Sequence, residues 1–369
     1  MEVLGDTPTA TGPARARARE IVRSAPVRRV MKLAAESALP SEVETVLAEA
    51  ILQARGVAVV ERAATEGRRT WERIAALRVL SAARREAAWV PLRDALVTGR
   101  PEVGNAVIGM LGQHPDPRAA TLLAEALQFG RHSRSRIATA LESFPREVPE
   151  IIAPLMDAKD EQVRYWSVQL MRRYPDAPGL GTRLLALTND ASAFVRKAAL
   201  DTLTAVRTTG TVAAARRCLG DEIPYVRAQA ARTLGALGGP DSTQALLPLL
   251  ADRDWWVRYA AKHSLEMIGG DVEAALLDTL SHDDSFARNG AAEVLQNLGT
   301  FERFLMREAA GTPSPAGIEM LKRLAHAGGA RMWASALARL GAADQERARM
   351  LLADIVVDFT SPLPLEPRS

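Results

Sequence analysis

The sequence has a single cysteine and no long apolar run, and each shortage excludes a class of protein. One cysteine, Cys218, cannot form an internal disulfide, which mildly favours a reducing compartment. No stretch approaches the ~20 apolar residues of a membrane-spanning helix. The first thirty residues also lack the apolar segment of a secretory signal. We therefore expect a cytoplasmic, water-soluble chain, or the soluble part of a longer protein.

The net charge is small, and its distribution is more informative than its size. Residues 1–40 contain seven basic and four acidic residues, so this segment accounts for the whole formal charge of +3. We interpret it as a basic, partly helical N-terminal extension or cap, which could contact an anionic membrane surface. The rest of the chain is neutral overall, whereas a groove that holds DNA should be strongly basic. A nucleic-acid partner is therefore not expected.

An internal repeat is the main feature of the sequence. Three segments align without a gap at a spacing of 31 residues and share five identities. These are Asp190, Val195, Arg196, Ala199 and Leu203; Asp221, Val226, Arg227, Ala230 and Leu234; and Asp252, Val257, Arg258, Ala261 and Leu265. Valine, alanine and leucine at spacings of four lie on one face of a helix, so each segment predicts a helix with one buried stripe.

Helix-start and helix-end residues flank these segments. Good N-cap residues stand three positions before the valine position or its equivalent, at Asp160, Ser192, Asp254 and Asp284. In the repeat between them, Pro224 occupies a first-turn position, where proline is tolerated. Gly235, Gly238 and Gly239 are then expected to end that helix.

A second amphipathic run precedes each of these helices, for example at residues 243–250 and 271–280. Each unit is thus a helical hairpin that cannot bury its apolar face alone, so the units must stack. The sequence predicts an all-α solenoid of about ten hairpins over residues 41–358. Residues 359–369 contain three prolines and are expected to form a disordered tail.

This repeat resembles the short bacterial HEAT-like repeat that is also found in phycobilisome lyases. The stretch from Gly239, Pro240 and Asp241 through Leu250 to Val257 and Arg258 carries the resemblance. The resemblance implies that the second helix of each hairpin lines a concave face. It also implies that the aspartates and arginines of the motif tie neighbouring turns together, at Asp190, Arg196, Asp221, Arg227, Asp252 and Arg258.

Aromatic residues recur at one position of the repeat. Phe194, Tyr225, Trp256 and Phe286 each begin a second helix, at spacings of 31, 31 and 30 residues. Trp255, Tyr259, Lys262 and His263 accompany Trp256, and Tyr165 and Trp166 form a second cluster. Such residues either anchor a partner or pack between repeats. Packing is favoured for Phe194 and Phe286, whereas two adjacent tryptophans cannot both point inward.

No group of residues indicates catalysis, cofactor binding or a metal site. The five histidines show no metal-ligand spacing, and helix capping explains the run His282, Asp283 and Asp284.

The leading hypothesis is a non-enzymatic scaffold that binds a protein or peptide on its concave face. The alternatives are a HEAT-like enzyme of the bilin-lyase or DNA-base glycosylase type, or the soluble part of an envelope-associated protein. The last rests on the run from Trp71 to Leu80, which resembles HEAT modules that follow a membrane anchor.

Overall fold

The computed structural model describes residues 41–83, 86–113, 116–310 and 314–354, preceded by residues 16, 20, 22, 24, 25 and 29–32. Within this described part every regular element is helical. Most of the basic segment 1–40 and all of the tail 359–369 lie outside the described residues. The chain forms two compact units, Met1–Ala177 and Pro178–Ser369, and each is a stack of helical hairpins. This is the all-α solenoid that the repeat predicts.

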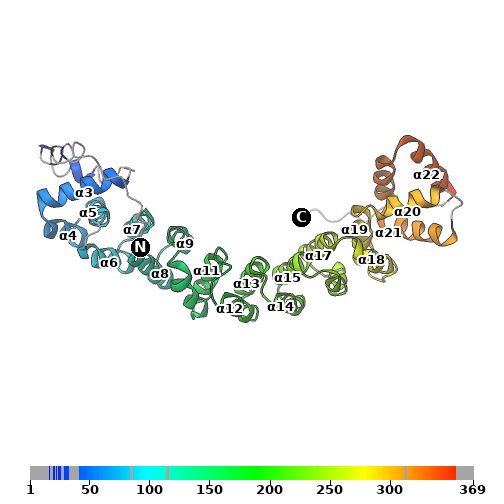
Figure 1. Ribbon diagram of the computed structural model, residues 1–369, viewed down its shortest axis with the longest axis horizontal. Helices are drawn as coiled ribbons and strands as arrows, with labels where there is room; N and C mark the ends of the chain where they lie inside the picture. The colour runs from blue at the N-terminus through cyan, green and yellow to red at the C-terminus, as the bar shows by residue number, and fades with distance from the viewer. Residues whose placement is uncertain are drawn as a thin grey trace, which may run out of the picture. The chain divides into compact units, whose positions relative to one another are not determined.

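The first unit has two layers of helices (Figure 1). Its elements are α3 (Ser41–Arg55), α4 (Val57–Glu66), α5 (Thr70–Ala82), η1 (Glu86–Ala88), α6 (Trp89–Val97), α7 (Pro101–Gln113), α8 (Pro117–Phe129), α9 (Arg134–Leu141), α10 (Val148–Ile152), η2 (Ala153–Asp157) and α11 (Glu161–Met171). The second helices α5, α7, α9 and α11 pack on one another in that order. Each also packs on the first helix of its own hairpin, and this builds the second layer.

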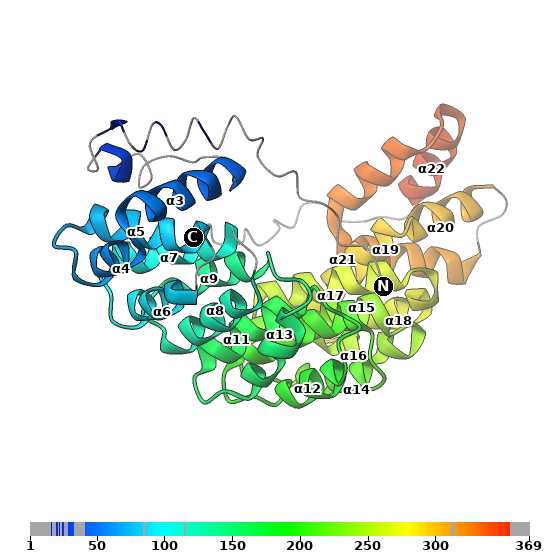
Figure 2. The same cartoon turned by 60° about the vertical axis from the view of Figure 1, so that its left-hand side comes forward.

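The second unit repeats this arrangement, as the two views in Figures 1 and 2 show. Its elements are α12 (Leu180–Leu187), α13 (Ala193–Val206), α14 (Thr211–Cys218), α15 (Pro224–Leu237), η3 (Pro240–Ser242), α16 (Thr243–Leu246), η4 (Leu247–Ala251), α17 (Trp255–Ile268), η5 (Gly270–Val272), α18 (Glu273–Thr279), α19 (Ser285–Asn297), α20 (Thr300–Ala309), α21 (Pro315–Arg339) and α22 (Ala342–Asp354). Helices α13, α15, α17 and α19 form one layer, and the shorter first helices of the hairpins form the other.

The repeated valine, alanine and leucine positions form the core between the layers. Val226, Ala230 and Leu234 of α15 are fully buried, as are the equivalent residues of α13 and α17. Because alanine keeps the second helices close, neighbouring helices also exchange side-chain hydrogen bonds. The Ser264 hydroxyl donates to the Ala231 carbonyl oxygen at 2.9 Å, and the Thr204 and Thr233 hydroxyl oxygens lie 2.9 Å apart.

The helix starts agree with the caps that the sequence predicts, with one exception. The side chains of Asp160, Asp254 and Asp284 accept backbone N–H groups of the first turns of α11, α17 and α19. Ser192 occupies the N-cap position of α13, but its side chain makes no capping hydrogen bond. Its own backbone N–H instead donates to the Asp190 carboxylate at 2.8 Å, so Asp190 and not Ser192 supplies the side chain that holds this turn.

Two local expectations were wrong. Residues 243–250 do not form one α-helix: α16 ends at Leu246 and a 3-10 segment follows, in which Pro248 has no N–H to donate to the previous turn. Gly238 is the C-cap of α15, as expected, but Gly235 does not end this helix and lies inside it. A Cβ atom at residue 235 would approach the Cα atom of Ser264 to 2.7 Å, so this glycine permits the close contact of α15 with α17.

Within the described part, no helix combines the length and apolar character that a bilayer crossing requires.

Candidate functional site

A ladder of ion pairs joins neighbouring hairpins of the second unit. The Arg196 guanidinium donates from Nε to Oδ2 of Asp221 at 2.7 Å and from Nη2 to Oδ1 at 2.8 Å. Arg227 binds Asp252 in the same way, with both distances at 2.8 Å. Each pair is bidentate, and its side chains are about nine-tenths buried. We call this repeated arrangement the arginine ladder.

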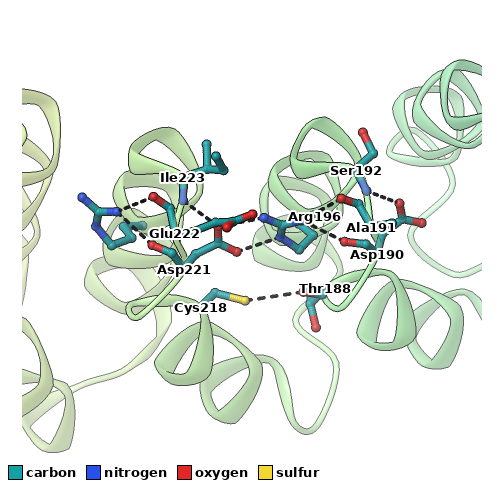
Figure 3. A network of polar contacts seen from close by, with 10 residues as sticks. Thr188, Asp190, Ala191, Ser192, Arg196, Cys218, Asp221, Glu222 and Ile223 are labelled. Carbon is teal, nitrogen blue, oxygen red and sulfur yellow. Dashed lines mark hydrogen bonds and ion pairs between the residues drawn. The ribbon is translucent and has the colours of Figure 1, made fainter.

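Each ladder arginine also holds its own turn. Nη1 of Arg196 donates to the carbonyl oxygens of Asp190 and Ala191, at 2.9 and 3.2 Å, and Figure 3 shows this network. Nη1 of Arg227 makes the same pair of bonds to Asp221 and Glu222. One guanidinium therefore fixes the turn that precedes its helix and the aspartate of the next hairpin.

Each ladder aspartate likewise has two roles. Oδ1 of Asp221 accepts the Ile223 backbone N–H at 2.9 Å while it accepts Nη2 of Arg196, as Figure 3 shows. Burial alone would raise the pKa of this carboxyl. The hydrogen bonds from Arg196 and Ile223 and the nearby positive charges outweigh burial, so the pKa of Asp221 lies below its ordinary value. The same causes lower the pKa of Asp252, and hydrogen bonding to Asp221 raises the pKa of Arg196.

The ladder changes at Arg258. Its Nη1 still donates to the carbonyl oxygens of its own turn, at Asp252 and Arg253. The residue six positions before the next motif arginine, however, is His282 and not an aspartate. Nδ1 of His282 accepts the Asp284 backbone N–H at 3.0 Å, which is the turn bond that Asp221 and Asp252 make elsewhere. Histidine thus replaces the capping role of the aspartate but not its charge.

The side chain of Arg258 rests on an aromatic ring. Its guanidinium carbon lies 4.2 Å from the centroid of the Phe286 ring. Among the residues that the structure describes, Nε and Nη2 of Arg258 have no carboxylate partner. The ladder of the second unit therefore has two filled rungs and, at Arg258, one rung whose carboxylate is missing.

The first unit uses a different ion pair between hairpins. Nη2 of Arg134 donates to Oδ2 of Asp160 at 2.5 Å. Asp160 is the N-cap of α11, and the position two residues before it, where the ladder aspartate would stand, is Ala158. In both units an arginine of one hairpin binds an aspartate in the turn of the next hairpin, but the aspartate occupies a different position of that turn in the two units.

Aromatic side chains project from the same helix starts. We call Phe194, Tyr225, Trp255, Trp256, Tyr259 and Phe286 the aromatic ridge. Their exposed fractions are 54%, 36%, 45%, 60%, 46% and 48%, respectively. Phe194 nevertheless stacks on Tyr225 of the next hairpin, with ring centroids 5.5 Å apart, so it contacts a neighbouring repeat and remains half exposed.

Trp255, Trp256 and Tyr259 form a compact aromatic cluster on the first turns of α17. Trp255 stacks on Tyr259 with centroids 5.4 Å apart and an interplanar angle of 18°. Trp256 meets Trp255 edge-on, at 4.6 Å and 77°. The three rings therefore contact one another as one cluster. They present one firm aromatic surface to solvent.

The other predicted site residues are less available. Nζ of Lys262 forms an ion pair with Oε2 of Glu293 at 2.6 Å, and its side chain is mostly buried. His263 is exposed, and its Nδ1 lies 3.7 Å from Oε2 of Glu266. Tyr165 and Trp166 make an edge-to-face contact at 5.5 Å but belong to the first unit. They are not part of the aromatic ridge.

Sequence reasoning found the ridge and the ladder positions but missed the significance of His282. The available signal was the residue six positions before Arg288, together with the repeat spacing, which falls from 31 to 30.

Among the described residues, no group of three His, Cys, Asp or Glu side chains is placed to hold a metal ion. Cys218 is buried, and burial raises the pKa of its thiol.

Comparisons with known proteins identify the repeat. Residues 180–266 match the family model for HEAT repeats. The structure is similar to the Escherichia coli protein YibA, at 16% identity over 69% of this chain and 97% of that one, with a TM-score of 0.40. It is similar to the CpcE–CpcF complex of phycocyanin lyase from a Nostoc species, at 21% identity over 57% of this chain and 90% of that one, with a TM-score of 0.34.

A third similar structure is the karyopherin Kap121p bound to Pho4p, at 12% identity over 95% of this chain and 48% of that one, with a TM-score of 0.47. The search of curated proteins finds no match. Residues 180–266 coincide with the hairpins that carry both filled rungs of the arginine ladder. Residues 180–266 are HEAT repeats, and this match lies in the second unit.

Proposed function

We propose that the protein is a non-enzymatic scaffold whose second unit binds a protein or peptide partner through the aromatic ridge. The observation that carries this proposal is the exposure of six aromatic side chains at successive helix starts. Tryptophan, tyrosine and arginine are the residue types that concentrate binding energy at protein interfaces.

The rigidity of the ridge supports the proposal. The rings of Trp255, Trp256 and Tyr259 hold one another in place, and the helix that carries them begins at the capping residue Asp254. A partner that docks here would lose less free energy to the ordering of side chains, because each of these rings already packs against another. The resemblance to HEAT repeats further implies that the second helices face the concave side, so we place the partner there.

Substitution of one tryptophan tests the proposal. Trp256→Ala removes the most exposed ring of the cluster and leaves the buried stripe of α17 intact. We expect Trp256→Ala to weaken partner binding by about 2 kcal/mol, or roughly thirty-fold in Kd, with a small effect on stability. Wild-type and variant proteins would capture partners from native cells, and the Kd of each purified partner would then be measured.

Phe129→Ala is the matched control, since Phe129 is a half-exposed aromatic residue at the end of α8 in the first unit. Partners that bind through the ridge should be kept by Phe129→Ala and lost by Trp256→Ala. Equal capture by all three proteins, with a large loss of thermal stability in Trp256→Ala, would instead assign the ridge to packing.

A further inference from the structure

The two filled rungs of the arginine ladder show what the guanidinium of Arg258 is shaped to bind. In both rungs the Nε and Nη2 edge of the arginine faces a carboxylate, and both oxygens accept hydrogen bonds at 2.7–2.8 Å. Arg258 occupies the same position of its helix and holds its own turn through Nη1 in the same way. Its Nε and Nη2 edge has no acceptor among the described residues. We call this edge the open rung.

We propose that the open rung binds a carboxylate of the partner, an aspartate or glutamate side chain on a peptide that lies across the aromatic cluster. This inference rests on the proposed function and adds the chemical character of the partner. The partner's carboxylate would bind the Nε and Nη2 edge of Arg258, as Asp221 and Asp252 bind the same edge of Arg196 and Arg227 in the filled rungs. An acidic residue beside an apolar or aromatic one would satisfy both the open rung and the neighbouring rings.

The guanidinium of Arg258 is already held in position for such a ligand. Its two Nη1 bonds fix one side, and the Phe286 ring lies against it at 4.2 Å. Bidentate binding of carboxylate to arginine is stronger and more directional than a single charge contact. A partner would therefore meet a guanidinium that is ordered before binding, next to Trp255 and Tyr259 on the same helix.

The acidic residues near Arg258 do not fill the open rung. Asp284 caps α19 by accepting the Ala287 N–H, and no ion pair joins it to Arg258 among the described residues. Asp254 caps α17 by accepting the Trp256 N–H. Asp283 is exposed in the turn before α19. Asp254 and Asp284 are thus committed to backbone groups, in contrast to Asp160, which caps its helix and also binds Arg134.

The first arm of the test supplies the missing carboxylate from the chain itself. His282→Asp places an aspartate at the ladder position, where the turn bond to the Asp284 N–H already exists. We expect this variant to form a third filled rung and to raise the Tm by roughly 2 °C. His282→Asn keeps the turn bond without the charge. Ser281→Asp adds the same charge at the exposed neighbouring residue, so neither variant should raise the Tm.

The second arm measures binding with peptides selected on the wild-type protein from a random library of displayed twelve-residue sequences. Each selected peptide is synthesised with its carboxylates and again with asparagine or glutamine in their place. We expect the amide versions to bind at least ten-fold more weakly. His282→Asp should weaken the binding of the acidic peptides to the same degree, because the new Asp carboxylate fills the rung. Arg258→Lys should weaken the binding of these peptides similarly, because lysine cannot bind a carboxylate bidentately.

The controls separate the open rung from the ridge as a whole. His282→Asn and Ser281→Asp should change peptide Kd values by less than three-fold. Peptides that require Trp256 but bind equally well without carboxylates, or equally well to His282→Asp, would overturn the open rung and leave the proposed function standing. A selection that yields no peptide sensitive to Trp256→Ala would overturn the proposed function, and with it this inference.

Discussion

At the residue scale, the ladder aspartates connect stability to pH. The pKa of Asp221 is lower in the folded chain than in the unfolded one, because the hydrogen bonds and charge of Arg196 outweigh its burial. A lowered folded-state pKa stabilises the fold above the unfolded pKa of about 3.9, and this contribution is lost as the pH falls through the folded value. The ladder should therefore hold fully at neutral pH and weaken in acid.

Asp221→Asn tests this coupling. Asparagine still accepts the Ile223 N–H but leaves the guanidinium of Arg196 without a charged partner. We expect a loss of about 2 kcal/mol in the free energy of unfolding at pH 7, because the pair is largely buried. The difference from wild type should shrink below about pH 4. Urea unfolding at several pH values measures it, and a difference that does not change with pH would contradict the assignment.

The role of a single residue could be predicted from the sequence where local structure alone determines it. The cap residues Asp160, Asp254 and Asp284 follow from the start of the buried stripe and are confirmed. The pairing of Arg196 with an aspartate twenty-five residues later does not follow from the sequence alone. It depends on the offset between stacked turns, which only the packed hairpins define, and from the sequence it follows only through the resemblance to HEAT-like repeats.

At the scale of the element, two glycines in second helices should respond to alanine in opposite directions. Gly109 lies in α7 with open space around a Cβ atom, so Gly109→Ala should stabilise the protein by about 0.5–1 kcal/mol through helix propensity. At Gly235 a Cβ atom would lie 2.7 Å from the Ser264 Cα atom. Gly235→Ala should therefore force α15 and α17 apart and destabilise the protein, despite the same gain in propensity.

Thermal unfolding of both variants is a direct comparison, because the substitution is identical and only the neighbour differs. Stabilisation by Gly235→Ala would show that α15 can move away from α17 at little cost. A lower Tm in Gly109→Ala would show instead that the exposed face of α7 is constrained in a way that the packing does not explain.

The sequence predicts which helices are present better than it predicts where each helix begins and ends. The 31-residue spacing indicates the second helices, and α13, α15 and α17 all start within two residues of the aromatic position. The first helices are short and irregular, and Pro248 splits one of them into α16 and η4. Gly235 was misread as a helix end because a glycine near a helix terminus and a glycine at a helix contact give the same local signal.

At the scale of the whole molecule, stacked repeats contact mainly their neighbours, so damage should stay local. Asp252→Ala removes the carboxylate that Arg227 binds between α15 and α17. We expect faster amide hydrogen exchange in residues 211–268 and unchanged exchange in residues 41–177, as measured by mass spectrometry. Asp283→Ala, in an equivalent turn but outside the filled rungs, is the control. Uniform acceleration along the chain would indicate global cooperativity instead.

The class of architecture was readable from periodicity, whereas the division into two units was not. The hairpin pattern continues through residue 177 without a break in composition, although the contacts separate there. The aromatic ridge was likewise predicted as a set of positions. Its exposed fractions required the packed structure, because a large side chain at a repeated position can serve either the core or the surface.

The constant 31-residue offset of the filled rungs makes one hairpin exchangeable for the next. Removing residues 207–237 takes out one whole period, from the end of α13 to the end of α15. Asp252 then follows Arg196 at the sequence distance that Asp221 holds now, so we expect the shortened chain to form an equivalent bidentate pair. We therefore expect a chain that has lost or gained one period to fold, with the open rung still at the end of the series, and circular dichroism of the shortened chain would check it.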